Sequence, residues 1–365
     1  IRLFTMSSPV YRGLGVLYGQ FIGDALGSRY EFESGTIVKN KLQADRDSSG
    51  LVPLLGEGPF GYGPGMVTDD GEMAMSLLSS CLSHEVFDPS SVACAYVRWA
   101  QSNPPDIGNT CRGALTIREK IPKDWPNQFT QEQKDKVRMA VEENVRNRNK
   151  HSLSNGSLMR QSVLTAVYAA NDFGASTKEN AEKFLLSAVE FDTLLTHSNP
   201  VAIEATKTYA LILFHLVRGK TPEEAIESAL STVNSKEIRS LVDAAREKAV
   251  PVTLPDGSAS NGDDSNIGYF GVSLQIAVHY LLHASSFSSG VESAVAIGGD
   301  TDTNGCIAGA LLGARFGQEG IPAEWIQSVE KAPLRLKGEN GIESFEQMVE
   351  GIRKRYDGTE GENVE

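Results

Sequence analysis

Three glycines spaced four residues apart lie in the apolar segment 14–27. Gly15, Gly19 and Gly23 would share one face of a helix, because residues i and i+4 lie one above the other. A face without side chains lets another helix approach closely, so we predict a tightly packed helix here. The same spacing favours helix pairing in membranes, but Asp24 lies within the segment, which argues against a membrane helix.

The rest of the chain repeats a pattern of helix, short polar turn and helix. Alternating Val, Ile and Thr runs, which would indicate β-strands, are nearly absent from the sequence. We therefore predict an all-α fold, a single compact domain over residues 12–355 with its loops gathered at one end. Residues 1–11 are expected to be an N-terminal extension and residues 356–365 a flexible acidic tail. The expected helices are 14–27, 73–82, 89–101, 111–120, the charged segment 131–150, 158–170, 181–195, 201–219, 222–230, 236–249, 272–283 and 307–316, and 36–66 is expected to be an irregular loop.

Composition restricts the classes of partner. The 365 residues carry a formal net charge of −13, with 40% hydrophobic and 22% charged residues, which is ordinary for a globular protein. The negative charge argues against binding a nucleic-acid backbone, since no broad basic face is expected. No segment is predicted to be long enough and apolar enough to span a membrane. The cysteines lack a Cys-x-x-Cys spacing and are expected to be buried, reduced thiols of a cytoplasmic protein: Cys81, Cys94, Cys111 and Cys306.

An acidic cluster precedes the small-residue helix 307–316. Gly298 and Gly299 lead into the alternating run Asp300-Thr301-Asp302-Thr303. In an extended segment the two carboxylates would point to one side, about 6 to 7 Å apart. They would repel each other unless a proton or a cation lay between them. A helix cap is the alternative interpretation, but a cap needs only one acid, so we favour a metal site.

A second acidic cluster, Thr68-Asp69-Asp70-Gly71-Glu72, begins the helix expected over 73–82. Asp69 and Glu72 fit a capping box, and acids in a first turn suit the helix dipole. A cap and a ligand role are therefore equally supported by this cluster alone. If the two helix starts meet, four carboxylates and two threonine hydroxyls form an all-oxygen site. Such ligands select Mg²⁺ or Mn²⁺ and could hold two ions.

Other polar residues are less specific. The Ser-Asn-Gly-Ser run at 154–157 opens an apolar helix, and free backbone N–H groups there could hold a phosphate without a basic side chain. His197 is equally consistent with a structural role and a ligand contact. His279 and His283 have zinc-ligand spacing, but a third ligand is not evident, so an ordinary helix face is expected. Glu31, judged alone, is expected to be a solvated loop acid.

The motifs in this order resemble those of the ADP-ribosylglycohydrolases, which include dinitrogen reductase-activating glycohydrolase and the ADP-ribosylarginine hydrolases. The resemblance runs from about residue 12 to about residue 317. It implies an all-α domain of orthogonal helices with two divalent metal ions, Mg²⁺ or Mn²⁺. The motifs are Gly23-Asp24-Ala25-Leu26-Gly27, Thr68-Asp69-Asp70, Asp106-Ile107-Gly108, Asn155-Gly156-Ser157-Leu158-Met159-Arg160, Thr196-His197 and Gly299-Asp300-Thr301-Asp302-Thr303.

The resemblance also implies roles for individual residues. Glu31 falls where some members have a mobile glutamate that reaches the metals or the substrate, which replaces the expectation of a solvated acid. Glu31, Asp302 and Asp106 are the expected catalytic residues. The implied metal ligands are Thr68, Asp69, Asp70, Asp300, Asp302 and Thr303. The implied substrate-binding residues are Asp106, Gly108, Asn109, Asn155, Gly156, Ser157, His197 and, against adenine, Tyr269. Gly71 departs from the family pattern, which often has a threonine there.

The expected function is removal of ADP-ribose from a modified protein side chain, with ADP-ribose as the product. Asp106 resembles an acid that arginine-specific members place near the guanidinium, so arginine is the favoured acceptor, with serine or another O-linked acceptor as the alternative. Two further alternatives are a non-catalytic ADP-ribose-binding protein and an immunity protein that also blocks a cognate ADP-ribosyltransferase by contact. The segment before Arg12 is the candidate for such a contact.

Overall fold

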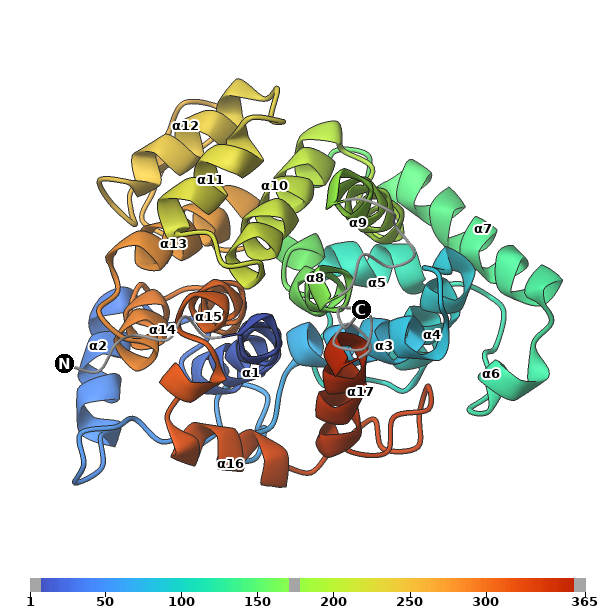
Figure 1. Cartoon of the computed structure of the whole chain (residues 1–365), viewed down its shortest axis with the longest axis horizontal. Coiled ribbons are helices and arrows are strands. Elements are labelled where there is room, and N and C mark those ends of the chain that lie inside the picture. The colour runs from blue at the N-terminus through green and yellow to red at the C-terminus, as the bar shows by residue number, and fades with distance from the viewer. Residues whose placement is uncertain (1–7, 171–177, 358–365) are drawn as a thin grey trace, which may run out of the picture.

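The computed structural model describes residues 8–170 and 178–357. Within these residues the chain forms 17 α-helices, two short 3-10 helices and one two-stranded antiparallel ribbon, which confirms the all-α prediction (Figure 1). The α-helices are α1 Pro9–Gly27, α2 Gly35–Asp45, α3 Asp69–Ser83, α4 Pro89–Gln101, α5 Asn109–Leu115, α6 Trp125–Gln128, α7 Gln131–Arg148, α8 Gln161–Ala170, α9 Lys178–Thr193, α10 Pro200–Val217, α11 Pro222–Leu230, α12 Lys236–Ala245, α13 Phe270–His283, α14 Phe287–Val295, α15 Thr301–Phe316, α16 Ala323–Lys331 and α17 Phe345–Asp357. The remaining elements are η1 Asn155–Ser157, η2 Gln318–Gly320, β1 Val252–Thr253 and β2 Ala259–Ser260.

Helices α1 and α15 lie side by side at the centre of the molecule (Figure 1). Their backbones touch through glycines: a Cβ added to Gly19 would lie 2.1 Å from the carbonyl oxygen of Gly309. The glycine spacing therefore correctly predicted a close helix partner for residues 14–27. The same relation holds one turn to either side, where a Cβ on Gly15 would lie 2.2 Å from the carbonyl oxygen of Gly313 and one on Gly23 would lie 1.9 Å from that of Gly305.

Other helices enclose this central pair. Almost every residue of α1 from Gly13 onward, and of α15 up to Ala314, is buried, as expected of helices covered on all sides. Helix α10 lies next to them and is long and apolar enough to cross a membrane by length and composition, with 72% of that stretch buried inside the protein. The prediction that no segment meets this criterion was therefore wrong. Such a helix is also typical of a protein core.

The segment 36–66 is not wholly irregular, because it contains α2. Val38 and Leu42 are four residues apart and buried, so one face of this short helix packs on the core, while the opposite face is exposed and includes Ile37. The helix expected over 111–120 ends at Leu115. Helices α14, α16 and α17 were not predicted. Each is short or strongly mixed in polarity, and each forms by covering the outside of the core.

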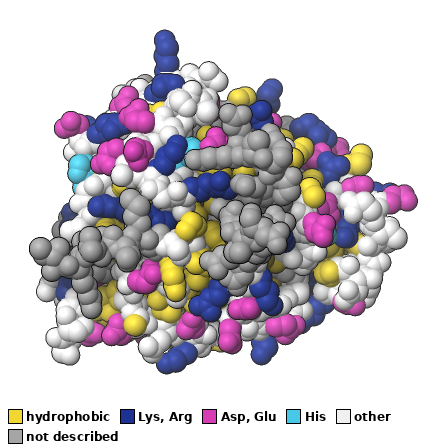
Figure 2. Space-filling model, viewed as in Figure 1, with side chains coloured by type: hydrophobic (Ala, Val, Ile, Leu, Met, Phe, Trp, Pro, Cys, Tyr) yellow, Lys and Arg dark blue, Asp and Glu magenta, His cyan; other side chains and the backbone are white. Residues whose placement is uncertain are grey.

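The charged segment 131–150 forms α7, which packs against α4 and α5. Three valines at a spacing of four, Val137, Val141 and Val145, are buried beneath its charged face. All four cysteines are buried and free. Acidic and basic side chains are interspersed over the described part of the face shown in Figure 2.

The predicted domain limits at 12 and 355 remain predictions. Helix α1 already begins at Pro9, and α17 continues to Asp357. Most of the predicted extension, residues 1–7, and most of the predicted tail, residues 358–365, lie outside the described residues.

Candidate functional site

A cleft of about 450 Å³ brings together the two acidic clusters from opposite ends of the chain. Asp69 and Asp70, at the start of α3, line it together with the first turn of α15. The hydroxyl of Thr303 donates a hydrogen bond to Oδ1 of Asp70 at 3.3 Å. The predicted meeting of the two helix starts is therefore confirmed. The acids that line the cleft are Glu31, Asp69, Asp70, Asp106, Asp300 and Asp302.

We had expected the second cluster to be extended, and this prediction was wrong. Helix α15 begins at Thr301, so Asp300 occupies the N-cap position and Asp302 lies in the first turn. Gly298 and Gly299 have φ values of +87° and +72°, which only glycine adopts readily, and this turn directs the chain into the helix. Carboxylate oxygens of Asp300, Asp302 and Glu31 nevertheless all lie within 4.8 Å of one another.

Glu31 reaches this group because the loop after α1 pairs with the turn before α15. The backbone N–H of Phe32 donates to the carbonyl oxygen of Gly299 at 2.8 Å, and that of Gly299 donates to the carbonyl oxygen of Glu33 at 2.8 Å. Glu31 is only 7% exposed, so it is not a solvated loop acid. Its position instead agrees with the role that the resemblance implied.

Asp24, a fully buried residue of α1, holds the first turn of α3 in place. Its carboxylate accepts from the backbone N–H of Thr68 at 3.0 Å and of Gly71 at 2.8 Å. A Cβ on Gly71 would lie 2.7 Å from Oδ2 of Asp24 and 2.6 Å from Cβ of Val67, which explains why a threonine is not accommodated there. Asp24 belongs to the motif Gly23-Asp24-Ala25-Leu26-Gly27, but the resemblance implied no role for it.

Helix α3 is capped differently from the predicted capping box. Its N-cap is Thr68, whose side-chain oxygen accepts from the backbone N–H of Asp70 at 3.4 Å. Glu72 does not cap the helix: its carboxylate accepts from Nε1 of Trp99 at 2.8 Å and from Nε of Arg335 at 2.6 Å. Thr68 is fully buried and does not line the cleft, although it borders Asp69 and Asp70, which do.

The charges and orphaned oxygens of the cleft fit divalent cations. Oε2 of Glu31 and Oδ2 of Asp70 are buried and have no hydrogen-bond partner among the described residues. Burial, together with the neighbouring carboxylates, raises the pKa of Glu31, Asp70 and Asp302. None of the described residues that line the cleft is Lys or Arg. No positively charged side chain of the described residues therefore compensates these carboxylates within the cleft. Oxygen atoms are the ligands that Mg²⁺ and Mn²⁺ prefer.

Five of the predicted substrate-binding residues line the cleft, and they come from the 106–109 loop and the 154–157 turn: Asp106, Gly108, Asn109, Asn155 and Gly156. The backbone N–H of Gly108 donates to Oδ2 of Asp69 at 3.2 Å. Nδ2 of Asn155 donates to Oδ2 of Asp300 at 2.6 Å. Both predicted substrate-binding segments are therefore joined to the acidic clusters.

Three predicted substrate-binding residues do not line the cleft: Ser157, His197 and Tyr269. The hydroxyl groups of Ser157 and Thr206 are hydrogen-bonded at 2.9 Å, and that of Tyr269 donates to Oε1 of Glu237 at 2.6 Å. These hydroxyl groups bond to residues of α10 and α12, which supports positioning roles for them, and direct contact with the substrate stays a prediction.

His197 lies one layer behind the cleft and is fully buried. Its Nε2 is 2.8 Å from the hydroxyl oxygen of Ser154, and its Nδ1 is 2.8 Å from that of Thr196. Burial, with the nearby charge of Arg160, lowers the pKa of His197 to about 3. The ring is therefore neutral and supports the 154–157 turn.

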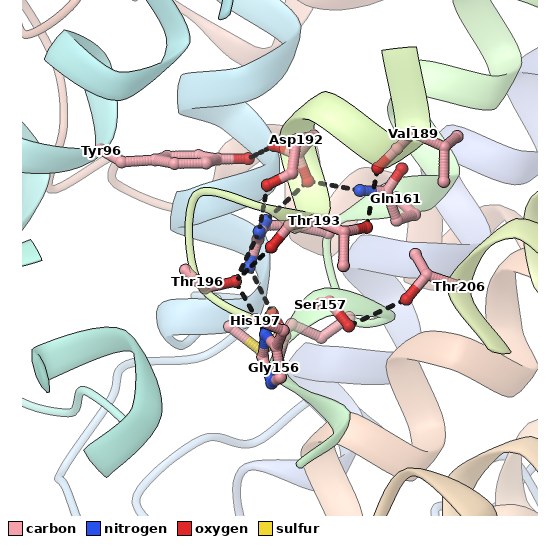
Figure 3. A network of polar contacts seen from close by, with 12 residues as sticks. Tyr96, Gly156, Ser157, Gln161, Val189, Asp192, Thr193, Thr196, His197 and Thr206 are labelled. Carbon is pink, nitrogen blue, oxygen red and sulfur yellow. Dashed lines mark hydrogen bonds and ion pairs between the residues drawn. The ribbon is translucent and has the colours of Figure 1, made fainter. Parts of the chain in front are cut away.

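A buried ion pair, whose Asp192 is labelled in Figure 3, also holds this turn in place. Nε of Arg160 donates to Oδ2 of Asp192 at 3.0 Å, and both side chains are fully buried. The guanidinium also donates to the carbonyl oxygen of Gly156 at 2.6 Å and to Oγ1 of Thr196 at 2.8 Å. The hydroxyl of Tyr96 donates to the other oxygen of Asp192 at 2.6 Å. The sequence analysis did not assign a role to this pair.

The histidine pair on α13 behaves as an ordinary helix face. Nδ1 of His279 is 2.8 Å from the carbonyl oxygen of Ala245, and Nε2 of His283 is 2.8 Å from that of Arg246. Each histidine thus has one ring nitrogen engaged by the end of α12 or the residue after it, which is consistent with the prediction.

Comparisons with known proteins agree with these features. A family model described as ADP-ribosylglycohydrolase matches residues 6–360. The chain is 32% identical to a protein of Acanthamoeba polyphaga mimivirus that is provisionally named an ADP-ribosyl glycohydrolase, over 87% of this chain and 90% of that protein. It is 26% identical to the ADP-ribosyl-(dinitrogen reductase) glycohydrolase of Rhodospirillum rubrum, over 87% and 90% respectively. It is also 26% identical to the ADP-ribosylarginine hydrolase Tri1 of Pseudomonas putida (strain GB-1), over 89% and 76%.

A solved structure of an ADP-ribosylglycohydrolase-related protein complex has the same fold, with a TM-score of 0.64 at 24% identity over 96% of this chain and 98% of that one. The family match extends over almost the whole sequence and includes both acidic clusters. The chain therefore belongs to the ADP-ribosylglycohydrolase family.

Proposed function

We propose that this protein is a metal-dependent hydrolase that removes ADP-ribose from modified arginine side chains of proteins. The observation that carries the proposal is the meeting of two acidic clusters, with Glu31 beside them, in one cleft. The names of the relatives from Rhodospirillum rubrum and Pseudomonas putida agree with an ADP-ribosylated protein as substrate.

Two Mg²⁺ or Mn²⁺ ions would be held by the acids and hydroxyls of the two helix starts. The proposed ligands are Thr68, Asp69, Asp70, Asp300, Asp302 and Thr303. The unpaired Oδ2 of Asp70 and the closely spaced carboxylates of Asp300 and Asp302 support these three members of the set. Thr68 does not line the cleft and is included because the family resemblance implies it. When bound, such ions hold vicinal hydroxyls of a sugar and lower the pKa of a bound water.

The chain's own residues would position the reactants. Glu31 and Asp302 have carboxylate oxygens within reach of the same point, so either can accept the proton of the attacking water. The concentrated negative charge also favours the oxocarbenium-like centre that develops at the ribose carbon. Asn155 and Gly156 would bind the diphosphate and the ribose, with the buried pair of Arg160 and Asp192 holding their turn in place.

Asp106 supports arginine as the acceptor. It is half-buried and lies in the cleft with Glu31 and Asp300, and burial raises its pKa. A guanidinium is always charged and carries donors arranged to match a carboxylate, so it would compensate this acid better than a neutral serine hydroxyl would. Serine or another O-linked acceptor is the competing substrate.

The decisive experiment is a release assay on arginine-linked and serine-linked ADP-ribose with Mg²⁺, Mn²⁺ or a chelator. We expect release from arginine that chelation abolishes, and a loss of at least about 100-fold in Asp302→Asn. Asp256→Asn, in the exposed turn between β1 and β2, is the matched control and should retain full activity. Release from serine with none from arginine would overturn the acceptor assignment.

The same assay tests the remaining alternatives. A parent protein that binds ADP-ribose but releases none from either linkage would favour a non-catalytic ADP-ribose-binding role. If Asp302→Asn hydrolyses as fast as an active parent protein, the role assigned to Asp302 is wrong. Blocking of a cognate ADP-ribosyltransferase by contact would require residues before Arg12, so deleting residues 1–7 should reduce protection if that partner exists. A cytoplasmic location remains a prediction that fractionation would test.

A further inference from the structure

Phe32 is the most unusual residue at the mouth of the cleft. Its side chain is 57% exposed, although a large aromatic ring normally gains stability by burial. Its φ is +65°, a conformation in which a bulky residue without glycine's freedom is strained. A strained and half-exposed phenylalanine is difficult to explain by the stability of the fold, and such outliers concentrate at functional sites.

The conformation of Phe32 is imposed by its surroundings. Its backbone N–H is bonded to the carbonyl oxygen of Gly299, and a β-bridge joins Ser34 to Gly298. The two glycines of the α15 approach therefore determine where the ring is presented. The side chain is carried into the cleft lining by the same pairing that places Glu31 among the carboxylates.

Two further aromatic residues support the ring. Phe60 meets Phe32 edge to face, with centroids 6.1 Å apart, and Tyr62 meets Phe60 at 6.5 Å. Tyr62 is buried, yet its hydroxyl has no hydrogen-bond partner in the described part of the chain. The carboxylates of Asp69 and Asp106 lie close enough to contribute to the raised pKa of Tyr62, after burial and Glu72. Phe60 and Tyr62 thus pack behind the ring of Phe32, which is the one of the three that lines the cleft.

The position of Phe32 identifies the part of the substrate that it would meet. It follows Glu31, whose carboxylate lies within 4.8 Å of those of Asp300 and Asp302. The proposed bond cleavage takes place at this group, so a ring at the adjoining mouth faces the acceptor side chain. Asp106 belongs to the same cleft and lies near enough to raise the pKa of Glu31.

We propose that the ring of Phe32 is a platform on which the guanidinium of the ADP-ribosylated arginine stacks, with its charge directed to Asp106. Aromatic faces attract guanidinium groups, and arginine stacks on them more readily than other cations do. The proposal rests on the proposed function and goes beyond it by assigning an acceptor-binding residue. An O-linked serine offers neither a charge nor a flat group to this surface.

The test measures how substitutions at position 32 affect two ligands: an arginine-linked ADP-ribosyl peptide, and free ADP-ribose, which lacks the acceptor. We expect Phe32→Ala to lower kcat/KM for an arginine-linked ADP-ribosyl peptide about tenfold while the Kd for free ADP-ribose changes less than about twofold. Phe32→Leu, which keeps an apolar side chain but no ring, should lose as much. Phe32→Trp should remain within about threefold of the parent protein. Phe191→Ala, on a comparably exposed phenylalanine of α9, should have no effect.

A binding measurement separates this proposal from the proposed function. The measurement uses a Glu31→Gln background, chosen to slow cleavage. There Phe32→Ala should raise the Kd for the arginine-linked peptide about tenfold and leave the Kd for ADP-ribose unchanged. This holds even if the parent protein does not cleave arginine linkages, in which case only the proposed function fails. An equal rise in both Kd values would show that the ring contacts the ADP-ribose part. An unchanged Kd for the peptide would show that the ring contacts neither the arginine nor the ADP-ribose. Each result would overturn the assignment.

Discussion

The hydroxyl of Thr303 donates to Oδ1 of Asp70 at 3.3 Å, although 233 positions of sequence separate the two residues. Both lie at helix starts that are held by the C-terminal half of α1. Asp24 of α1 binds the first turn of α3, and the carbonyl oxygen of Gly27 accepts from Oγ1 of Thr301 at 2.7 Å. One helix therefore sets the separation of the two acidic clusters.

Replacing Gly309 by alanine should destabilise the protein. The new Cβ would lie 2.1 Å from the backbone carbonyl oxygen of Gly19, and a backbone cannot yield as a flexible side chain can. We expect a loss of about 2 kcal/mol or more in the free energy of unfolding, despite the better helix propensity of alanine. Urea unfolding measures it. Gly108→Ala, whose Cβ would meet open space, is the control and should change stability by less than about 0.5 kcal/mol.

Replacing Asp24 by asparagine should weaken metal binding without removing a proposed ligand. The amide keeps the shape but offers only one oxygen to the backbone N–H groups of Thr68 and Gly71. We expect the affinity for Mg²⁺ or Mn²⁺ to fall about 10- to 100-fold, as for other residues that orient metal ligands. Titration calorimetry on the folded variant measures it, and unchanged affinity would contradict the positioning role.

The metal-free protein should lose stability as the pH rises. Burial and neighbouring carboxylates raise the pKa of Glu31 to about 10, and burial raises that of Asp24 to about 7, whereas both titrate near pH 4 when unfolded. Between about pH 4 and these values the folded state binds more protons, so the free energy of unfolding falls with rising pH. A divalent cation bound by the neighbouring carboxylates would favour the ionised forms of these acids and offset the loss. Mg²⁺ should therefore raise Tm more at about pH 8 than at about pH 5, and equal shifts would count against the site.

Breaking the buried ion pair should be costly. Arg160→Met leaves Asp192 charged and fully buried, which is expected to remove about 3 to 5 kcal/mol of stability. Lys136→Met, in the exposed pair with Glu132, should remove less than about 1 kcal/mol. Chemical unfolding of the two variants makes the comparison. A small effect of Arg160→Met would mean that Asp192 is solvated or protonated once its partner is gone.

Phe32→Gly should have a higher free energy of unfolding than Phe32→Ala. The φ of +65° strains any residue with a Cβ, and glycine adopts it freely. We expect Phe32→Gly to be about 1 kcal/mol more stable than Phe32→Ala in urea unfolding, although both lack the ring. An alanine variant as stable as the glycine variant would show that the loop relaxes to a negative φ.

Local patterns predicted most of the core helices and the two acidic clusters, but they missed α2, α14, α16 and α17. The glycine spacing indicated a close helix partner, and the small residues after Asp302 indicated a buried helix, because both properties depend on neighbours in sequence. The extended conformation expected for Asp300 to Thr303 was wrong, because α15 begins at Thr301. The conformations of Gly298 and Gly299, which direct the chain into that helix, depend on pairing with the distant loop at Phe32, which no local pattern records.

The orientation of side chains was harder to predict than their membership of motifs. Ser157, His197 and Tyr269 lie in or near the motif segments, yet each is turned towards Thr206, Ser154 or Glu237 and away from the cleft. Each partner lies on a different segment of the chain: Thr206 on α10, Glu237 on α12 and Ser154 at the start of the 154–157 turn. The roles of Asp24 and Arg160 were not predicted for a related reason. Each side chain holds another segment in place, and only the tertiary structure shows which segment that is.

The backbone contact between α1 and α15 limits how this protein can be redesigned. The two helices touch without intervening side chains, so no repacking of rotamers can absorb a change in their separation. A shift of one ångström there would exceed the tolerance of about 0.5 Å within which functional groups must be held. Metal affinity should therefore respond to substitutions at Gly15 or Gly313 far from the cleft. Changes of substrate are better sought in the loops that present Phe32 and Asp106, which can vary while the helix pair stays constant.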